Sequence, residues 1–315
     1  MSGLPKKIAA AAAALIAGFQ AANAEDLGPS LQKIKEAGAI AIGYRDSAIP
    51  ISYTDAQQQP IGFALDLCGL VASKIKQRLG LDDLKINYKA VTAADTAAPI
   101  ADGTIDLDCS AVPVKPDEQN AAFSIPVFES ELKWIVRRKL RVEREGRRRS
   151  RWETISPSSA EDLKGQTVAL TQGSAAIPLV LTLSSDRSLG LSIVMGKDDA
   201  EAFKLVETGK ASAFLADDVL LVGLKAGAKN PDALGFLDEA YPGQPHALML
   251  RKDDKPFKDL VDSTLTQAMN SGEYAKLYTK WFESPIPPKN VNLALPMPRK
   301  LKELVKTPAE TAAVR

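Results

Sequence analysis

The chain has 315 residues, of which 45% are hydrophobic and 25% are charged, with 20 glycines and 20 prolines; this ordinary globular composition excludes collagen-like, disordered and disulfide-dense proteins. A formal net charge of +1 gives no electrostatic reason to expect a nucleic acid partner, and two cysteines with one histidine are too few ligands for a conventional zinc site. At about 150 residues per domain, the length indicates two domains, each large enough for its own core.

The first 24 residues have the pattern of a secretory signal peptide. Lys6 and Lys7 precede an apolar run over residues 8–19, and Ala22-Asn23-Ala24 provides an A-x-A cleavage site. The alternative is a membrane anchor, but about 12 apolar residues are too few to span a bilayer. We therefore expect residues 1–24 to be cleaved and the mature protein to be exported, with a periplasmic location.

From residue 39 onward, strand-like and helix-like patterns alternate along the chain. In the first half, apolar residues recur at helical spacing over residues 63–75. The strands expected around this helix cover residues 39–44, 85–91 and 105–109. The second half repeats the theme, with helices expected after Gly173 and around residues 203–208. Its expected strands cover residues 167–170, 191–194 and 213–216.

The two halves share a helix-glycine-strand sequence. A helix is expected to end near Gly103 and another near Gly209, because glycine readily adopts the left-handed conformation that ends helices. Alternating strands and helices favour an α/β fold with parallel sheets. We expect two similar lobes with a ligand cleft between them, which is a preferred place for small-molecule sites. Two unrelated α/β domains in tandem are the alternative.

Export changes how the two cysteines are interpreted. Cys68 lies on the first helical pattern, and Cys109 ends a strand-like stretch. Exported thiols often pair in an oxidising compartment, so we favour a structural disulfide between them. Two buried free thiols are the alternative.

Short segments in a constant order carry a family resemblance over nearly the whole mature chain. They cover residues 43–47, 50–53, 62–66, 103–109, 121–124, 162–168, 213–218, 249–254, 271–282 and 285–290. Together they resemble the family 3 extracytoplasmic solute-binding proteins of ABC amino-acid importers, most closely the periplasmic glutamate/aspartate-binding branch. The resemblance implies a bilobed periplasmic-binding-protein fold of type II, in which a hinge joins two parallel-sheet lobes.

The resemblance also implies that lobe 1 is discontinuous. Residues 25–130 would form its first part, and residues 131–243 would form lobe 2, with a basic insertion at about 137–151. Residues 244–315 would return to lobe 1 and end in a C-terminal tail.

A free amino acid needs an acid for its ammonium group and a cation or backbone amides for its carboxylate. The resemblance implies that Asp217 supplies the acid, that the segment Gly173-Ser174 supplies amides at a helix start, and that Arg45 and Lys133 supply positive charge. The complete set of expected ligand-binding residues is Arg45, Ser52, Ser110, Lys133, Gly173, Ser174 and Asp217.

The sequence departs from the family pattern at its charged positions. Asp117 stands where an arginine usually clamps the carboxylate, and Lys115 is a possible replacement with poorer geometry. Asp199 stands where the glutamate/aspartate branch carries a histidine. The resemblance therefore implies a receptor for an amino acid or related compound without identifying it.

The basic segment at 137–151 has two interpretations: a docking patch for an acidic partner or anionic surface, or a solvated loop. His246 lies near the expected return to lobe 1, and we favour packing or hydrogen bonding near the hinge over catalysis as its role.

The leading hypothesis is a monomeric, non-enzymatic receptor that delivers its small-molecule ligand to an ABC permease, with no cofactor, metal or nucleic acid. One alternative is an accessory or sensor protein without a transport role. Another is a dehydratase-type enzyme on the same fold, with Asp117 or Glu118 as its general acid.

Overall fold

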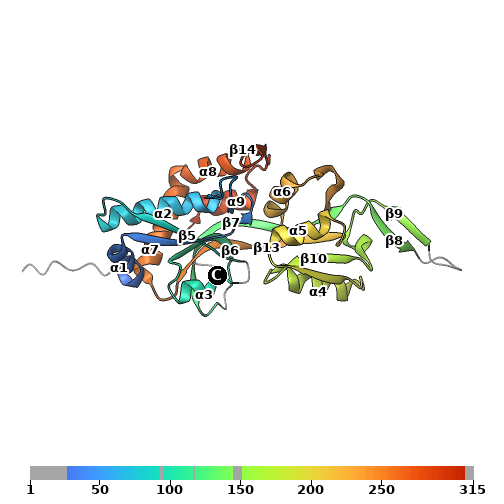
Figure 1. Ribbon diagram of the computed structural model, residues 1–315, viewed down its shortest axis with the longest axis horizontal. Coiled ribbons are helices and arrows are strands. Elements are labelled where there is room, and N and C mark those ends of the chain that lie inside the picture. The colour runs from blue at the N-terminus through green and yellow to red at the C-terminus, as the bar shows by residue number, and fades with distance from the viewer. Residues whose placement is uncertain (1–26, 93–94, 116–117, 145–150, 309–315) are drawn as a thin grey trace, which may run out of the picture.

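The computed structural model describes residues 27–92, 95–115, 118–144 and 151–308, and it has two lobes (Figure 1). The signal-peptide prediction and Asp117 lie outside the described residues. The helices are α1 (Gly28–Ala37), α2 (Phe63–Leu79), α3 (Ala97–Ala101), α4 (Ala176–Asp186), α5 (Asp199–Glu207), α6 (Asp218–Gly227), α7 (Lys255–Ser271), α8 (Glu273–Phe282) and α9 (Arg299–Lys306). None of the helices in this part of the chain has the length and apolarity of a membrane span.

The strands form one eight-stranded sheet and three small ones. The large sheet has the order β11-β10-β12-β7-β13-β6-β1-β5. Its strands are β1 (Ala39–Tyr44), β5 (Lys85–Ala90), β6 (Leu107–Pro113), β7 (Ala121–Arg137), β10 (Thr167–Thr171), β11 (Ser192–Gly196), β12 (Ala213–Asp217) and β13 (Leu234–Arg251). The small sheets contain β2 (Ser47–Ala48), β3 (Ser52–Thr54) and β4 (Pro60–Ile61), then β8 (Leu140–Arg144) and β9 (Arg151–Ile155), then β14 (Pro285–Ile286) and β15 (Val291–Asn292).

The large sheet has a parallel group at each end. Lobe 1 contains the parallel strands β5, β1 and β6, with α1, α2, α7 and α8 packed around them. Lobe 2 contains the parallel strands β11, β10 and β12, with α4, α5 and α6 (Figure 1). The expected two parallel-sheet lobes are joined into one sheet, because antiparallel β7 pairs with β12 of lobe 2, antiparallel β13 pairs with β6 of lobe 1, and β7 and β13 pair with each other.

The two long strands cross between the lobes side by side. Their pairing is interrupted between Pro242 and Pro245, opposite Glu131 and Glu129, because proline cannot donate a ladder hydrogen bond. Gly243 lies in this interruption, where an added Cβ would stand 2.0 Å from the Ser130 carbonyl oxygen. The crossing is therefore both irregular and closely packed.

Each lobe has its own apolar core. In lobe 1, the Phe63 ring packs edge to face against Tyr274 and Phe282, and all three side chains are fully buried. In lobe 2, Trp134 and Phe214 lie in two separate clusters. Helix α6 joins the lobes, because its Val219 and Leu220 belong to the lobe 1 core.

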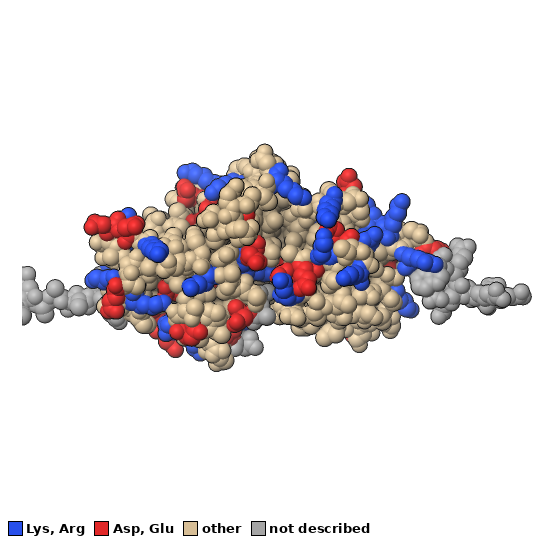
Figure 2. All heavy atoms as spheres, viewed as in Figure 1, with Lys and Arg blue, Asp and Glu red and all other residues tan. Residues whose placement is uncertain are grey.

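A disulfide joins Cys68 on α2 to Cys109 on β6, with their Cα atoms 6.3 Å apart. This is the pairing that the sequence favoured. Part of the basic insertion forms an antiparallel hairpin of β8 and β9, and residues 145–150 between them lie outside the described residues. Basic and acidic side chains are interspersed over both lobes on the face seen in Figure 2.

Candidate functional site

A cavity of about 240 Å³ lies between the two lobes, near the crossing strands. Its lining includes residues from lobe 1, from lobe 2 and from both crossing strands. The volume is slightly below the usual range for drug-sized ligands, which suits a single small metabolite. Of the expected ligand-binding residues, the lining contains Arg45, Ser110, Gly173, Ser174 and Asp217.

Arg45 follows β1 and is fixed through its backbone. Its amide donates to the Ser52 hydroxyl over 3.0 Å, and that hydroxyl donates to the Arg45 carbonyl over 3.2 Å. Ser52 is fully buried and does not line the cavity. The structure therefore gives Ser52 a supporting role behind Arg45 instead of the ligand contact expected of it.

The Arg45 guanidinium forms an ion pair across the cleft with Asp199, the first residue of α5. The Nη2 to Oδ2 distance is 2.5 Å, and the other Asp199 oxygen accepts from the Thr171 hydroxyl over 2.6 Å. Both charged side chains are largely buried, with exposed fractions of 12% for Arg45 and 6% for Asp199. The pair thus links the end of β1 in lobe 1 with the N-terminus of α5 in lobe 2, and Thr171 at the end of β10 holds Asp199 in place.

Asp217 ends β12 and is held from both crossing strands. One carboxylate oxygen accepts from the Ser130 hydroxyl on β7, and the other lies 3.5 Å from Nε2 of His246 on β13. Burial alone raises the pKa of Asp217, but the nearby His246, the Ser130 hydrogen bond and Arg45 together hold that pKa below its ordinary value. Asp217 is therefore an ionised acid on the cavity wall.

His246 also lines the cavity, and its Nδ1 is a buried polar atom without a partner among the described residues. Buried polar atoms are normally hydrogen-bonded, so an unpaired one beside a cavity is consistent with a group supplied from outside the chain. The sequence placed His246 near the hinge but gave no sign that it contacts Asp217.

Asp108 lies on β6 behind the cavity wall. Its side chain is inaccessible to solvent, and both carboxylate oxygens lie within 2.9 Å of the Ser110 hydroxyl. Burial raises the pKa of Asp108 to about 6, against the opposing effects of Ser110 and Arg45. Ser110 thus separates the cavity from a carboxyl group that is readily protonated.

The segment that leads into α4 lies on the cavity wall, and the Ser174 amide donates to the Thr171 carbonyl over 3.1 Å. Gly173 and Ser174 line the cavity, and the Ser174 hydroxyl accepts from the Ala176 amide over 3.1 Å. The first turn of α4 contains no acidic side chain. Because the N-terminus of a helix carries partial positive charge, this element can receive an anionic group.

Lys133 is not on the cavity. It lies on β7 opposite Ala216 of β12, and its charge acts on Asp218. The exposed Lys115 lines the cavity instead. Lys133 is therefore absent from the described cavity lining, although Ala216 opposite it belongs to that lining.

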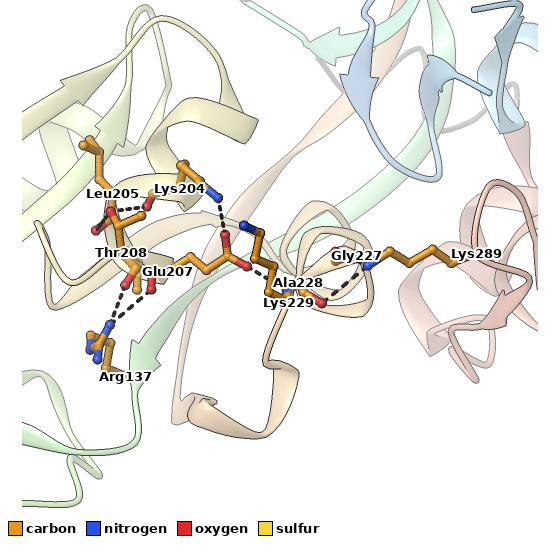
Figure 3. Close-up of polar contacts among 10 residues, drawn as sticks. Arg137, Lys204, Leu205, Glu207, Thr208, Gly227, Ala228, Lys229 and Lys289 are labelled. Atoms are coloured by element: carbon orange, nitrogen blue, oxygen red, sulfur yellow. Dashed lines mark hydrogen bonds and ion pairs between the residues drawn. The ribbon is translucent and has the colours of Figure 1, made fainter. Parts of the chain in front are cut away.

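Outside the residues that line the cavity, a contact at the end of α6 also joins the lobes (Figure 3). Lys289, between β14 and β15, donates to the carbonyl oxygens of Gly227 and Ala228 at the end of α6. At Gly223 in the same helix, an added Cβ would lie 2.3 Å from the carbonyl oxygen of Ile49. The lobes are therefore held in contact on this side by backbone packing that only glycine permits.

Comparisons with known proteins agree on one family. Residues 40–284 match the profile of the bacterial extracellular solute-binding proteins, family 3. An L-glutamate/L-aspartate-binding protein of Pseudomonas aeruginosa is 35% identical, covering 92% of this chain and 92% of that protein. A glutamate/aspartate import solute-binding protein of Escherichia coli is 32% identical, covering 98% of each.

Solved structures share the fold at lower identity. An ancestral arginine-binding protein bound to arginine has a TM-score of 0.64 and 23% identity, covering 78% of this chain and 98% of its own. An ancestral amino acid-binding protein, described as a precursor of cyclohexadienyl dehydratase, has a TM-score of 0.63 and 23% identity, covering 80% of this chain and 99% of its own.

Proposed function

The chain belongs to family 3 of the bacterial extracellular solute-binding proteins, and from this premise we propose that it captures a free amino acid and presents it to the permease of an ABC importer. It would do so in the periplasm as a monomer, after cleavage of the signal peptide at residues 1–24. Residues 25–130 and 244–315 would move as one lobe, and residues 131–243 as the other.

The observation that carries the proposal is the cavity between the lobes, with an acid on one wall and a helix N-terminus on another. Asp217 would accept the ligand's ammonium group, because its pKa lies below the ordinary value and keeps it ionised at neutral pH. The partial positive charge at the start of α4, together with Lys115, would receive the carboxylate. Arg45 and Ser110 complete the lobe 1 wall.

Ligand capture would shift a hinge equilibrium toward the closed arrangement. The Arg45–Asp199 pair and the contacts of α6 with lobe 1 both join the lobes. A ligand that contacts both lobes makes its full set of contacts only in the closed form. It therefore shifts the equilibrium toward that form by the difference in its binding free energy between the two forms. The permease would then distinguish loaded from empty receptor by shape.

A thermal-shift screen tests the proposal. Mature protein, unfolded with its disulfide intact and refolded to remove bound ligand, is mixed with the common amino acids, dicarboxylates, polyamines and small aromatic acids. A ligand at 100 times its Kd adds about 2.7 kcal/mol to the free energy of unfolding, which shifts the melting temperature clearly. We expect a shift with at least one amino acid. If none of the amino acids stabilises well-folded protein, the proposal is wrong.

A further inference from the structure

We propose that the Arg45–Asp199 pair makes this cavity selective for amino acids with uncharged side chains, so that glutamate and aspartate are excluded. The inference rests on the proposed function and names the class of ligand for the same site. It depends on which charges of the cavity are already paired before any ligand enters.

The positive charge of Arg45 is already paired with a carboxylate of the chain. Its guanidinium lies 2.5 Å from Asp199, and Asp199 is its only hydrogen-bond partner among the described side chains. A ligand carboxylate beside Arg45 would also stand beside the Asp199 carboxylate. Like charges in a poorly solvated site repel strongly, so a dicarboxylic amino acid would have to break the existing pair.

Asp199 cannot readily turn away to make room. Its second oxygen accepts from the buried Thr171 hydroxyl at 2.6 Å, and the residue begins α5, whose backbone fixes its position. Release of Arg45 would leave a carboxylate buried with one hydroxyl partner, which is unfavourable.

Other acidic residues around Arg45 add to the repulsion that a ligand carboxylate would meet there. The charge of Arg45 also acts on Asp217 on the cavity wall and on Asp108 behind it. The Arg45 guanidinium thus acts on Asp199 and Asp217 and on Asp108, which burial makes easier to protonate, while Nε2 of His246 also lies 3.5 Å from Asp217. Lys115 is the other lysine or arginine among the described cavity-lining residues, and it is exposed. In the proposed arrangement Lys115 and the start of α4 already receive the ligand's α-carboxylate, so a second carboxylate would have to lie beside the paired Arg45 or beside His246.

A cationic side chain fits no better. Asp199 is neutralised by Arg45, and Asp217 is needed for the ligand's ammonium group. Much of the remaining wall is apolar, including Ile51, Phe128, Leu132, Leu179 and Leu220. Burial of an unpaired charge against such a wall is costly, whereas an uncharged side chain is accommodated.

Titration calorimetry on stripped wild-type protein, with all common amino acids, tests the inference without any variant. We expect the tightest ligand to have an uncharged side chain and to bind at least about 100-fold more tightly than glutamate or aspartate, given the cost of like charges in contact. If glutamate, aspartate, lysine or arginine binds tightest, this inference is wrong and the proposed function stands. If no amino acid binds, both are wrong.

Asp199→Asn isolates the pair. The carboxamide keeps the shape and can still accept from Thr171, but it removes the negative charge beside Arg45. Loss of this cross-lobe pair affects closure around any ligand, so the informative quantity is the ratio of glutamate affinity to affinity for the uncharged ligand, which we expect to rise about tenfold or more. Asp259→Asn is the matched control, because Asp259 pairs with Lys255 on the surface of α7 and should alter neither affinity. An unchanged ratio of the two affinities in folded Asp199→Asn overturns the assignment.

Discussion

Strands β6 and β12 occupy equivalent places in the two lobes, yet their aspartates behave in opposite ways. Each strand is parallel to one neighbour and antiparallel to one crossing strand. Asp108 on β6 is fully buried with Ser110 as its hydrogen-bond partner, and burial raises its pKa to about 6. Asp217 on β12 reaches the cavity and meets Ser130 and His246, and its pKa is lowered. The partners, more than the residue type, decide which lobe offers an ionised acid to a ligand.

Covalent support also differs between the lobes. Replacement of both Cys68 and Cys109 by alanine removes the disulfide that ties β6 to α2, a link across 41 residues. We expect the free energy of unfolding to fall by on the order of 4 kcal/mol, because the denatured chain gains conformational entropy. Urea unfolding measures the change. Reductant should destabilise the wild type but not the double variant; equal stability of the two proteins without reductant would contradict the prediction.

Asp108→Asn tests the raised pKa in lobe 1. The native pKa of about 6 exceeds the ordinary value of 3.8, so the stabilisation from Asp108 is complete below pH 4 and is lost as pH rises through 6. The loss is on the order of 3 kcal/mol, and asparagine, which does not ionise, escapes it. Urea unfolding at pH 4, 5.5 and 7.5 should show the variant gaining stability relative to wild type as pH rises. A difference independent of pH would refute the assignment.

Asp217→Asn tests the lobe 2 acid as the ammonium partner. We expect the affinity for the best amino acid to fall about 100-fold, or about 2.7 kcal/mol, because a charge-assisted hydrogen bond is lost. Calorimetry at pH 7.5 measures it. Asp108→Asn is the matched control and should bind nearly as the wild type does, since Asp108 does not line the cavity. Equal losses in both variants would remove the distinction between the lobes.

Ser130→Ala tests how the low pKa of Asp217 is maintained. Asp217 stabilises the fold above the ordinary aspartate pKa, and this contribution is lost as pH falls through its lowered value. The variant should be about 1 kcal/mol less stable at pH 7, and the difference should shrink as the pH falls toward 2, because the carboxyl group is increasingly protonated. Urea unfolding at both pH values provides the measurement. Ser110→Ala makes the matching change beside Asp108, and its effect should instead appear above pH 6.

Local patterns predicted most of the parallel strands. The prediction for residues 39–44 coincides with β1, and those for 167–170 and 213–216 each fall within one residue of β10 and β12. Such strands are short apolar runs whose signal lies in consecutive residues. The length of β7 and β13 was not predicted, because prolines interrupt both strands and their partners lie far away in the chain.

The sequence predicted those parts of the candidate site that are placed by a residue's position at or near the end of a strand. Asp217, Ser110 and the Gly173-Ser174 segment lie on the cavity wall for this reason. The Arg45–Asp199 pair was not predictable, because its members are 154 residues apart and meet only through the approach of two lobes. Ser52 and Lys133 are absent from the described cavity lining: the Ser52 hydroxyl bonds to the Arg45 backbone, and Lys133 pairs with Ala216 across β7 and β12.

The contact of Lys289 with α6 should make the residence time of a bound ligand depend on ionic strength. Lys289 is exposed and donates to the terminal carbonyls of α6, where a helix carries partial negative charge. Dissolved ions screen such an exposed attraction, and in the proposed motion it is absent once the lobes separate. Rising ionic strength should therefore speed opening and shorten residence time, while the choice of amino acid, made by buried charges, stays the same. Under these proposals, ligand selection depends on the buried Arg45–Asp199 pair, and ligand release depends on the exposed Lys289 contact.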